Sequence, residues 1–109
     1  MENRAEIKKI ANKYGYDAQS RQLIEEMAEL TQAINKFWRK QLLCGQRDLL
    51  EIPIGTPEEK NIYEEIADVE ICLDQLKILL NIQTDVAINR EYKIARQLQR
   101  IRESEATNE

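Results

Sequence analysis

Histidine is absent from this chain of 109 residues, and cysteine occurs only at positions 44 and 72. Without histidine, the chain cannot form the Glu-x-x-His ligand sets of ferritin-like di-iron proteins. The number and spacing of the cysteines indicate neither a zinc site nor a disulfide framework. A metal site in this chain would therefore use oxygen ligands, which suit Mg²⁺ or Mn²⁺.

Long apolar runs and long basic tracts are also missing from the sequence. No segment approaches the roughly 18 consecutive apolar residues of a membrane span, and the amino end lacks the apolar run of a signal peptide. The formal net charge of −4 argues against duplex nucleic acid as a partner, because binding to a phosphate backbone needs a cationic surface. We therefore expect a cytoplasmic protein that has no membrane partner.

The length and the hydrophobic content of 42% predict one domain, spanning residues 1–109. Its core is expected at about residues 17–102, whereas residues 103–109 lack an apolar anchor and are expected to fray. A domain of this size is small for burying a ligand pocket alone. We therefore expect oligomerisation, as a homodimer or a homotetramer, to complete the core.

The most informative feature of the sequence is a helical pattern that occurs at residues 23–34 and again at residues 62–73. A shift of 39 positions, from 23 to 62, superimposes Leu23, Met27, Leu30 and Ile34 on Ile62, Ile66, Val69 and Leu73. The same shift superimposes Glu26 and Glu29 on Glu65 and Asp68. Each acidic pair thus lies beside an apolar stripe that is expected to face the core of a helical fold.

Side-by-side packing of these two helices would bring the four carboxylates to one edge of their interface. Glu26 and Glu65 lie about 60° from the first residue of each stripe, and Glu29 and Asp68 lie about 120° from it. Carboxylates so close repel one another and need a counter-charge, which a divalent cation supplies. The alternative is a solvated surface, since a single Glu-x-x-Glu is common on exposed helices. The repetition of the pair favours a metal site.

The two acidic motifs, EMAE at residues 26–29 and EIAD at residues 65–68, resemble the signature of the MazG-like, all-α nucleoside triphosphate pyrophosphohydrolases. The resemblance covers about residues 21–80 and, more weakly, the helix that follows. It implies that Glu26, Glu29, Glu65 and Asp68 are the catalytic residues and bind Mg²⁺, for which Mn²⁺ can substitute. It also implies hydrolysis of an NTP or dNTP to the monophosphate and pyrophosphate, as in the house-cleaning of a nucleotide pool.

The expected architecture is all-α, an antiparallel bundle of four main helices at about residues 1–14, 17–40, 56–80 and 84–102. Gly15 predicts a left-handed stop after the first helix. Thr56, Pro57 and Glu59 form the clearest start signal, as N-cap, first helical position and capping box. We expect the connection at residues 41–55, which includes Cys44, to pack on the domain or on a partner subunit, as a lid beside the site. The third helix is apolar nearly all round in its second half, which predicts an oligomer interface.

Cys72 lies on the second acidic helix, at the position that Ala33 occupies in the first copy of the pattern. We interpret Cys72 as a small buried hydrophobic residue. The alternative is a soft sulfur ligand beside a site of hard oxygen ligands.

Four side chains are candidates for binding the substrate, namely Lys36, Trp38, Lys93 and Arg96. Lys36 continues the lateral face that carries Glu29 and could reach a phosphate, although a solvated lysine is the alternative. Trp38 follows closely on the same helix, and packing in the core is the first expectation for it. Lys93 and Arg96 belong to a cationic stripe on the last helix, which could neutralise phosphate charge or simply complement the helix dipole.

The predicted reaction is metal-assisted hydrolysis without a covalent intermediate, because no serine or cysteine has a histidine to activate it. Together with the reaction that the resemblance implies, the expected function is Mg²⁺-dependent pyrophosphohydrolysis of a nucleoside triphosphate. Two alternatives stay open at this point: a helical protein that binds nucleotide without turnover, and a protein-interaction module whose acidic pairs are solvated. The sequence does not predict which base or sugar is preferred.

Overall fold

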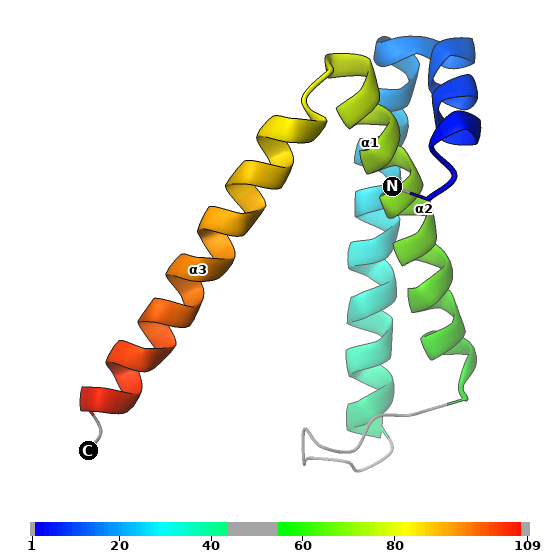
Figure 1. Ribbon diagram of the computed structural model, residues 1–109. Helices are drawn as coiled ribbons and strands as arrows, with labels where there is room; N and C mark the ends of the chain where they lie inside the picture. The colour runs from blue at the N-terminus through cyan, green and yellow to red at the C-terminus, as the bar shows by residue number, and fades with distance from the viewer. Residues whose placement is uncertain (1, 44–54, 108–109) are drawn as a thin grey trace.

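The computed structural model describes residues 2–43 and 55–107 of the chain. It contains α1 (Arg4–Leu43), α2 (Pro57–Leu80) and α3 (Gln83–Thr107), and these residues include no strand (Figure 1). The expected all-α fold is therefore confirmed. Cys44 and most of the connection for which we predicted a lid, residues 44–54, lie outside the described residues. No described helix combines the length and the apolar character that crossing a membrane requires.

α1 contains the first two of the four expected helices. Gly15 interrupts it with φ 85° and ψ 172°, a backbone conformation that is open almost only to glycine. The residues before Gly15 turn back and lie beside the C-terminal half of α2, as the blue segment of Figure 1 shows. The expected break at Gly15 is present, but the helix resumes directly after it, so the described residues form three helices rather than the predicted four.

The N-terminal segment, residues 4–14, covers part of α2. Ile7 and Ala11 are buried, and Ile7 lines a surface cavity together with Ile71 and Asp74 of α2. The sequence predicts that a partner subunit covers this apolar side of α2. In the structure the chain's own first residues cover part of that side, while Ile71 keeps 42% of its surface exposed.

Residues 17–40 of α1 and the whole of α2 form an antiparallel pair, which we call the hairpin (Figure 1). Its core consists of Leu23, Val69 and Cys72, with Leu30 and Leu76 packed against them. Leu23, Leu30 and Val69 belong to the two predicted stripes, which are thereby confirmed as part of the contact between the helices. Cys72 is buried as the repeat predicts, and so is its counterpart Ala33.

The outer members of both predicted stripes are not covered. Met27 and Ile34 on α1 and Ile66 and Leu73 on α2 keep between 39% and 50% of their surface exposed. The apolar arc of each helix is wider than the strip that a single neighbouring helix can cover. Within one chain, the hairpin is therefore an incomplete bundle.

The boundaries of α2 follow the signals in the sequence. Thr56 is the N-cap, and its hydroxyl accepts a hydrogen bond from the backbone N–H of Glu59 at 3.3 Å. The Glu59 carboxylate accepts one from the Gly55 N–H at 2.9 Å. The helix ends at Asn81, whose left-handed conformation (φ 56°) and N–H bond to Ile78 O close the last turn. The predicted range of residues 56–80 is confirmed.

α3 leaves the hairpin after the turn at Asn81 and Ile82, and it packs against α2 only near that turn (Figure 1). No described residue of α3 is buried. The Cα radius of gyration is 18.2 Å, compared with about 13 Å for a compact domain of this length. The predicted antiparallel four-helix bundle is therefore wrong for a single chain. α3 also continues to Thr107, past the expected end near residue 102, into the segment that was expected to fray.

Candidate metal centre

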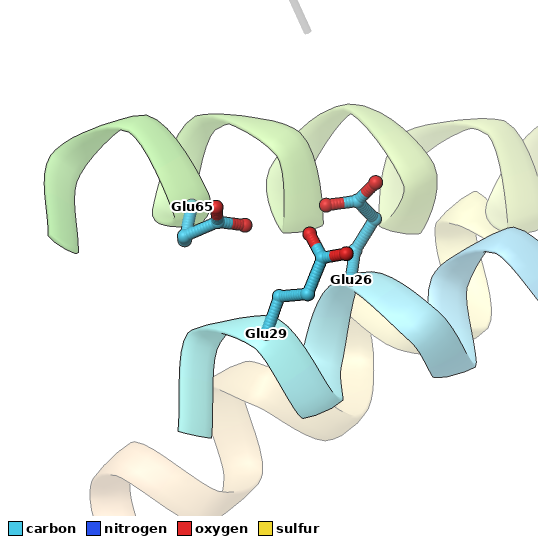
Figure 2. A group of neighbouring side chains, drawn as sticks. All are labelled: Glu26, Glu29 and Glu65. Atoms are coloured by element: carbon cyan, nitrogen blue, oxygen red, sulfur yellow. The ribbon is translucent and has the colours of Figure 1, made fainter. Parts of the chain in front are cut away.

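Three acidic side chains meet between α1 and α2. Glu26 and Glu29 project from α1 and Glu65 projects from α2, with their carboxylates turned toward one another (Figure 2). One oxygen from each carboxylate lies within 4.8 Å of the other two. We call these three residues the carboxylate cluster. The distances are those of a group that could share one cation.

The position of the cluster follows from the spacing of acidic and apolar residues along the two helices. Leu23 and Val69 bury their side chains where the helices touch. Glu26 lies three residues after Leu23, and Glu65 lies four residues before Val69, so each carboxylate lies close to the buried line of contact. Because the helices run antiparallel, these positions come opposite one another, and Glu29 extends the group along α1.

The carboxyl of Glu65 is electrostatically perturbed by its surroundings. Burial raises the pKa of the Glu65 carboxyl first, and the nearby charges of Glu29, Asp68 and Glu26 raise it further, as does a side-chain hydrogen bond with Glu29. Both causes oppose the ionised form, since desolvation and like charges each disfavour a carboxylate. The site is therefore short of positive charge.

Two oxygen atoms of the carboxylate cluster lack a partner. Glu26 Oε2 and Glu65 Oε2 are buried and accept no hydrogen bond. Within the described part of the chain, the ion pairs are Lys60–Glu64 and Lys77–Asp74, and neither involves the cluster. Buried acceptors without donors are costly. Oxygen ligands, negative charge and unpartnered atoms together fit a divalent cation such as Mg²⁺ or Mn²⁺.

Asp68 lies at the edge of the carboxylate cluster rather than inside it. It is exposed and is not among the three carboxylates that share the 4.8 Å limit. Its charge nevertheless raises the pKa of both Glu65 and Cys72. Of the four predicted ligands, the structure thus gathers three and places the fourth beside them. That all four bind a metal stays a prediction.

Cys72 borders the cluster on α2. Its thiol is free and buried, and burial raises its pKa, with further increases from the charges of Glu26 and Asp68. A thiol held in its protonated form is a poor metal ligand and a poor nucleophile. The structure therefore favours the interpretation of Cys72 as a packing residue.

Amide side chains lie next to the carboxylate cluster along the two helices. They are not part of the four-acid motif. The Gln22 amide donates a hydrogen bond to Glu26 Oε1 at 2.7 Å. Further along, the Gln19 amide donates to Gln75 Oε1 at 2.6 Å, and Gln75 is only 2% exposed. The signal for these residues was present in the spacing: positions 19, 22, 26 and 29 repeat at intervals of three and four residues, as do 65, 68, 72 and 75.

The four candidate substrate-binding residues lie in different places. Lys36 is exposed on α1, about two turns beyond Glu29 and on the same side of the helix. Trp38 is 54% exposed, so the expected burial in the core is not found. Lys93 and Arg96 lie on α3, away from the hairpin, and the Arg96 guanidinium lies 5.9 Å from the centre of the Tyr92 ring. Within one chain, the structure does not bring the α3 cations to the acids.

Comparison of the chain with protein-family models, with curated proteins and with solved structures finds no match in any of the three.

Proposed function

We propose that this chain is a divalent-cation-dependent nucleoside triphosphate pyrophosphohydrolase, with Mg²⁺ as its cofactor and Mn²⁺ as a substitute. The observation that carries the proposal is the carboxylate cluster, in which two buried oxygen atoms lack a partner. Carboxylates held together against their repulsion are typical of functional sites. The likeness of the two acidic motifs to the MazG-like signature supports the choice of reaction.

The residues of the hairpin have separate roles in this proposal. Glu26, Glu29 and Glu65 would hold the cation, and Asp68 would add negative charge from the edge of the site. Gln22 would keep the Glu26 carboxylate in place through the hydrogen bond to Oε1. When bound, the cation would supply the positive charge that phosphate oxygens need and a more acidic water molecule.

No covalent intermediate is part of the proposed reaction. The Cys72 thiol borders the cluster, but its raised pKa keeps it protonated, so it is unsuited to attack phosphorus. Water is therefore the proposed nucleophile. Lys36, on the same side of α1 as Glu29, is the described cation best placed to meet a phosphate from the chain's own hairpin.

The test is pyrophosphate release from a panel of standard and modified nucleoside triphosphates, with Mg²⁺ and with EDTA. We expect Mg²⁺-dependent release from at least one nucleotide, and its loss in Glu65→Gln. Glu64→Gln is the matched control, because Glu64 is adjacent, points to solvent and pairs with Lys60. Its activity should equal that of the wild type.

The same experiment separates the alternatives. A folded protein that releases no pyrophosphate, yet is stabilised by Mn²⁺ and nucleotide together, would be a binding protein without turnover. A protein that shows neither release nor any response to Mn²⁺ would contradict the metal centre itself, and it would favour a helical interaction module. Equal activity in Glu65→Gln and Glu64→Gln would contradict the assignment of the site.

A further inference from the structure

The hairpin has an apolar side that no part of the described chain covers. On α1, Ile24, Met27, Ile34 and Trp38 are 43–64% exposed and lie roughly a quarter turn from the line of contact with α2. On α2, Ile66 and Leu73 lie on the corresponding side. On each helix, the exposed apolar residues are offset from the line of contact in the same direction around the helix axis. Because the two helices run antiparallel, these equal offsets place both sets of residues on one side of the hairpin. Glu29 and Asp68 are rotated in the opposite sense, so the acidic and apolar sides are different.

α3 carries a second uncovered apolar side. Ile88, Tyr92, Ile94, Leu98 and Ile101 are 44–65% exposed and occupy one half of the helix circumference. Most of the stability of a helix in a protein comes from packing of its apolar side against other elements rather than from helix propensity. α3 has no buried residue, so it lacks that packing within its own chain.

The turn between α2 and α3 keeps the two apolar sides apart. Asn81 adopts the left-handed conformation, and the N–H groups of Asn81 and Ile82 bond to Ile78 O and Lys77 O at 3.1 and 3.0 Å. After this closed turn α3 points away from the hairpin (Figure 1). The apolar side of the hairpin and that of α3 can therefore meet only between two copies of the chain, as long as the turn holds.

We propose that the protein forms a homodimer in which α3 of each copy lies along the apolar side of the partner's hairpin. The lengths of the two surfaces match: the span from Ile24 to Trp38 is about 21 Å and that from Ile88 to Ile101 is about 20 Å.

The area available is sufficient for a stable dimer. An ordinary stable interface removes about 800 Å² of surface from each partner. Each copy contributes six hairpin residues and five α3 residues to the two contacts. To reach about 800 Å² per copy, each of these residues would need to lose roughly 70 Å² of exposed surface. A reciprocal contact of this kind has two-fold symmetry and closes on itself, so it produces a dimer rather than a filament.

The first test is the mass of the wild-type chain in solution, by light scattering after size exclusion at micromolar concentration. We expect the mass of two chains. Leu98→Glu on α3 and Ile34→Glu on the hairpin should each raise the dimer dissociation constant more than about tenfold, because each buries a charge at an apolar contact. The matched controls are Arg100→Gln and Gln32→Glu, which lower the charge by the same amount on the polar sides of the same helices and should remain dimers. Far-UV circular dichroism reports whether each variant keeps its helices.

A mixing experiment tests the pairing of α3 with the hairpin. In a mixed dimer of Leu98→Glu with Ile34→Glu, both substitutions fall at the same one of the two contacts, and the other contact is wild type. Native mass spectrometry should therefore show mixed dimers from two variants that are each monomeric alone. Failure to recover mixed dimers would overturn the proposed pairing and favour contact of hairpin with hairpin or of α3 with α3. A monomeric wild type would overturn the dimer. The apolar sides would then be covered by another protein, or by α3 folded back onto the hairpin of its own chain. Neither outcome depends on pyrophosphohydrolase activity.

Discussion

The side-chain amide of Gln22 donates a 2.7 Å hydrogen bond to Glu26 Oε1, one turn further along α1. The bond satisfies one oxygen of the carboxylate and leaves Glu26 Oε2 as a buried acceptor without a donor. Hydrogen bonds behind the ligands commonly orient metal sites. Gln22 is therefore the part of the site that a search for acidic pairs alone would pass over.

Replacement of Gln22 should weaken metal binding without removing a ligand. We expect Gln22→Leu to reduce Mn²⁺ affinity about tenfold, the lower end of the range for lost partners of metal ligands. Titration calorimetry with Mn²⁺ measures the affinity directly. Gln32→Leu is the control, because Gln32 is exposed on the same helix, and it should bind Mn²⁺ as the wild type does. Equal affinity for the two variants would show that the Gln22 bond does not position Glu26.

Divalent cations should stabilise the folded chain. A cation that binds only the native state at one hundred times its dissociation constant adds about 2.7 kcal/mol to the free energy of unfolding. The melting temperature should therefore rise with Mn²⁺ or Mg²⁺, and EDTA should reverse the rise. Glu26→Gln should lose the response, whereas Glu25→Gln, on the exposed side of α1, should keep it. A response that survives in Glu26→Gln would place the cation elsewhere.

Removal of one charge from the cluster should stabilise the metal-free protein at neutral pH. The pKa of Glu65 is raised in the folded state, so the folded chain binds this proton more tightly than the unfolded chain does. The contribution of Glu65 to stability is thus greatest below its ordinary pKa, and it is lost as the pH rises through the raised folded value. In EDTA, Glu65→Gln should have a higher urea midpoint than the wild type at pH 7.

The difference between Glu65→Gln and the wild type should shrink toward zero as the pH falls below about 4.3, the ordinary pKa of glutamate, because the wild-type carboxyl is then protonated in both the folded and the unfolded chain. Glu64→Gln, at an exposed position, should show a much smaller difference at either pH. A less stable Glu65→Gln in EDTA at pH 7 would contradict the repulsion inferred for the cluster. Addition of Mn²⁺ should reverse the order, because only the wild type then gains a bound cation.

Gly15 is the position where a substitution should act through the backbone alone. Its φ of 85° lies in a region that residues with a side chain rarely adopt, while an added Cβ would meet no atom within 4 Å. Gly15→Ala should therefore cost about 1–3 kcal/mol of stability, measured by urea unfolding. Asn12→Ala, at an exposed position in the preceding turn, should change stability by less than about 0.5 kcal/mol. A neutral Gly15→Ala would show that the N-terminal segment can pack without this bend.

Local features of the fold could be predicted from the sequence because local chemistry determines them. Thr56, Pro57 and Glu59 marked the start of α2, and Gly15 marked the break in α1. The acidic spacing likewise placed Glu26, Glu29 and Glu65 on facing helices, since helical periodicity determines which side each residue occupies.

The arrangement of α3 could not be predicted in the same way. Its apolar side is compatible with packing on its own hairpin or on another molecule, and the periodicity is the same in both cases. The choice depends on the direction that the chain takes after Asn81, a single left-handed residue. The distance of Lys93 and Arg96 from the acids follows from the same turn. Trp38 was expected in the core because the sequence pattern predicts a four-helix bundle, and a single chain does not complete that bundle.

The separation of α3 from the hairpin divides the chain into parts that should open at different free energies. Amide groups of Val69 and Cys72, beside the buried core, should exchange with solvent only through global unfolding. Amides in the middle of α3 should exchange through local fraying in a single copy, because no buried side chain holds that helix. If α3 packs on a second copy, the protection of these amides should increase with protein concentration. Hydrogen exchange measured at two protein concentrations would therefore show, for each residue of α3, whether it contacts a partner.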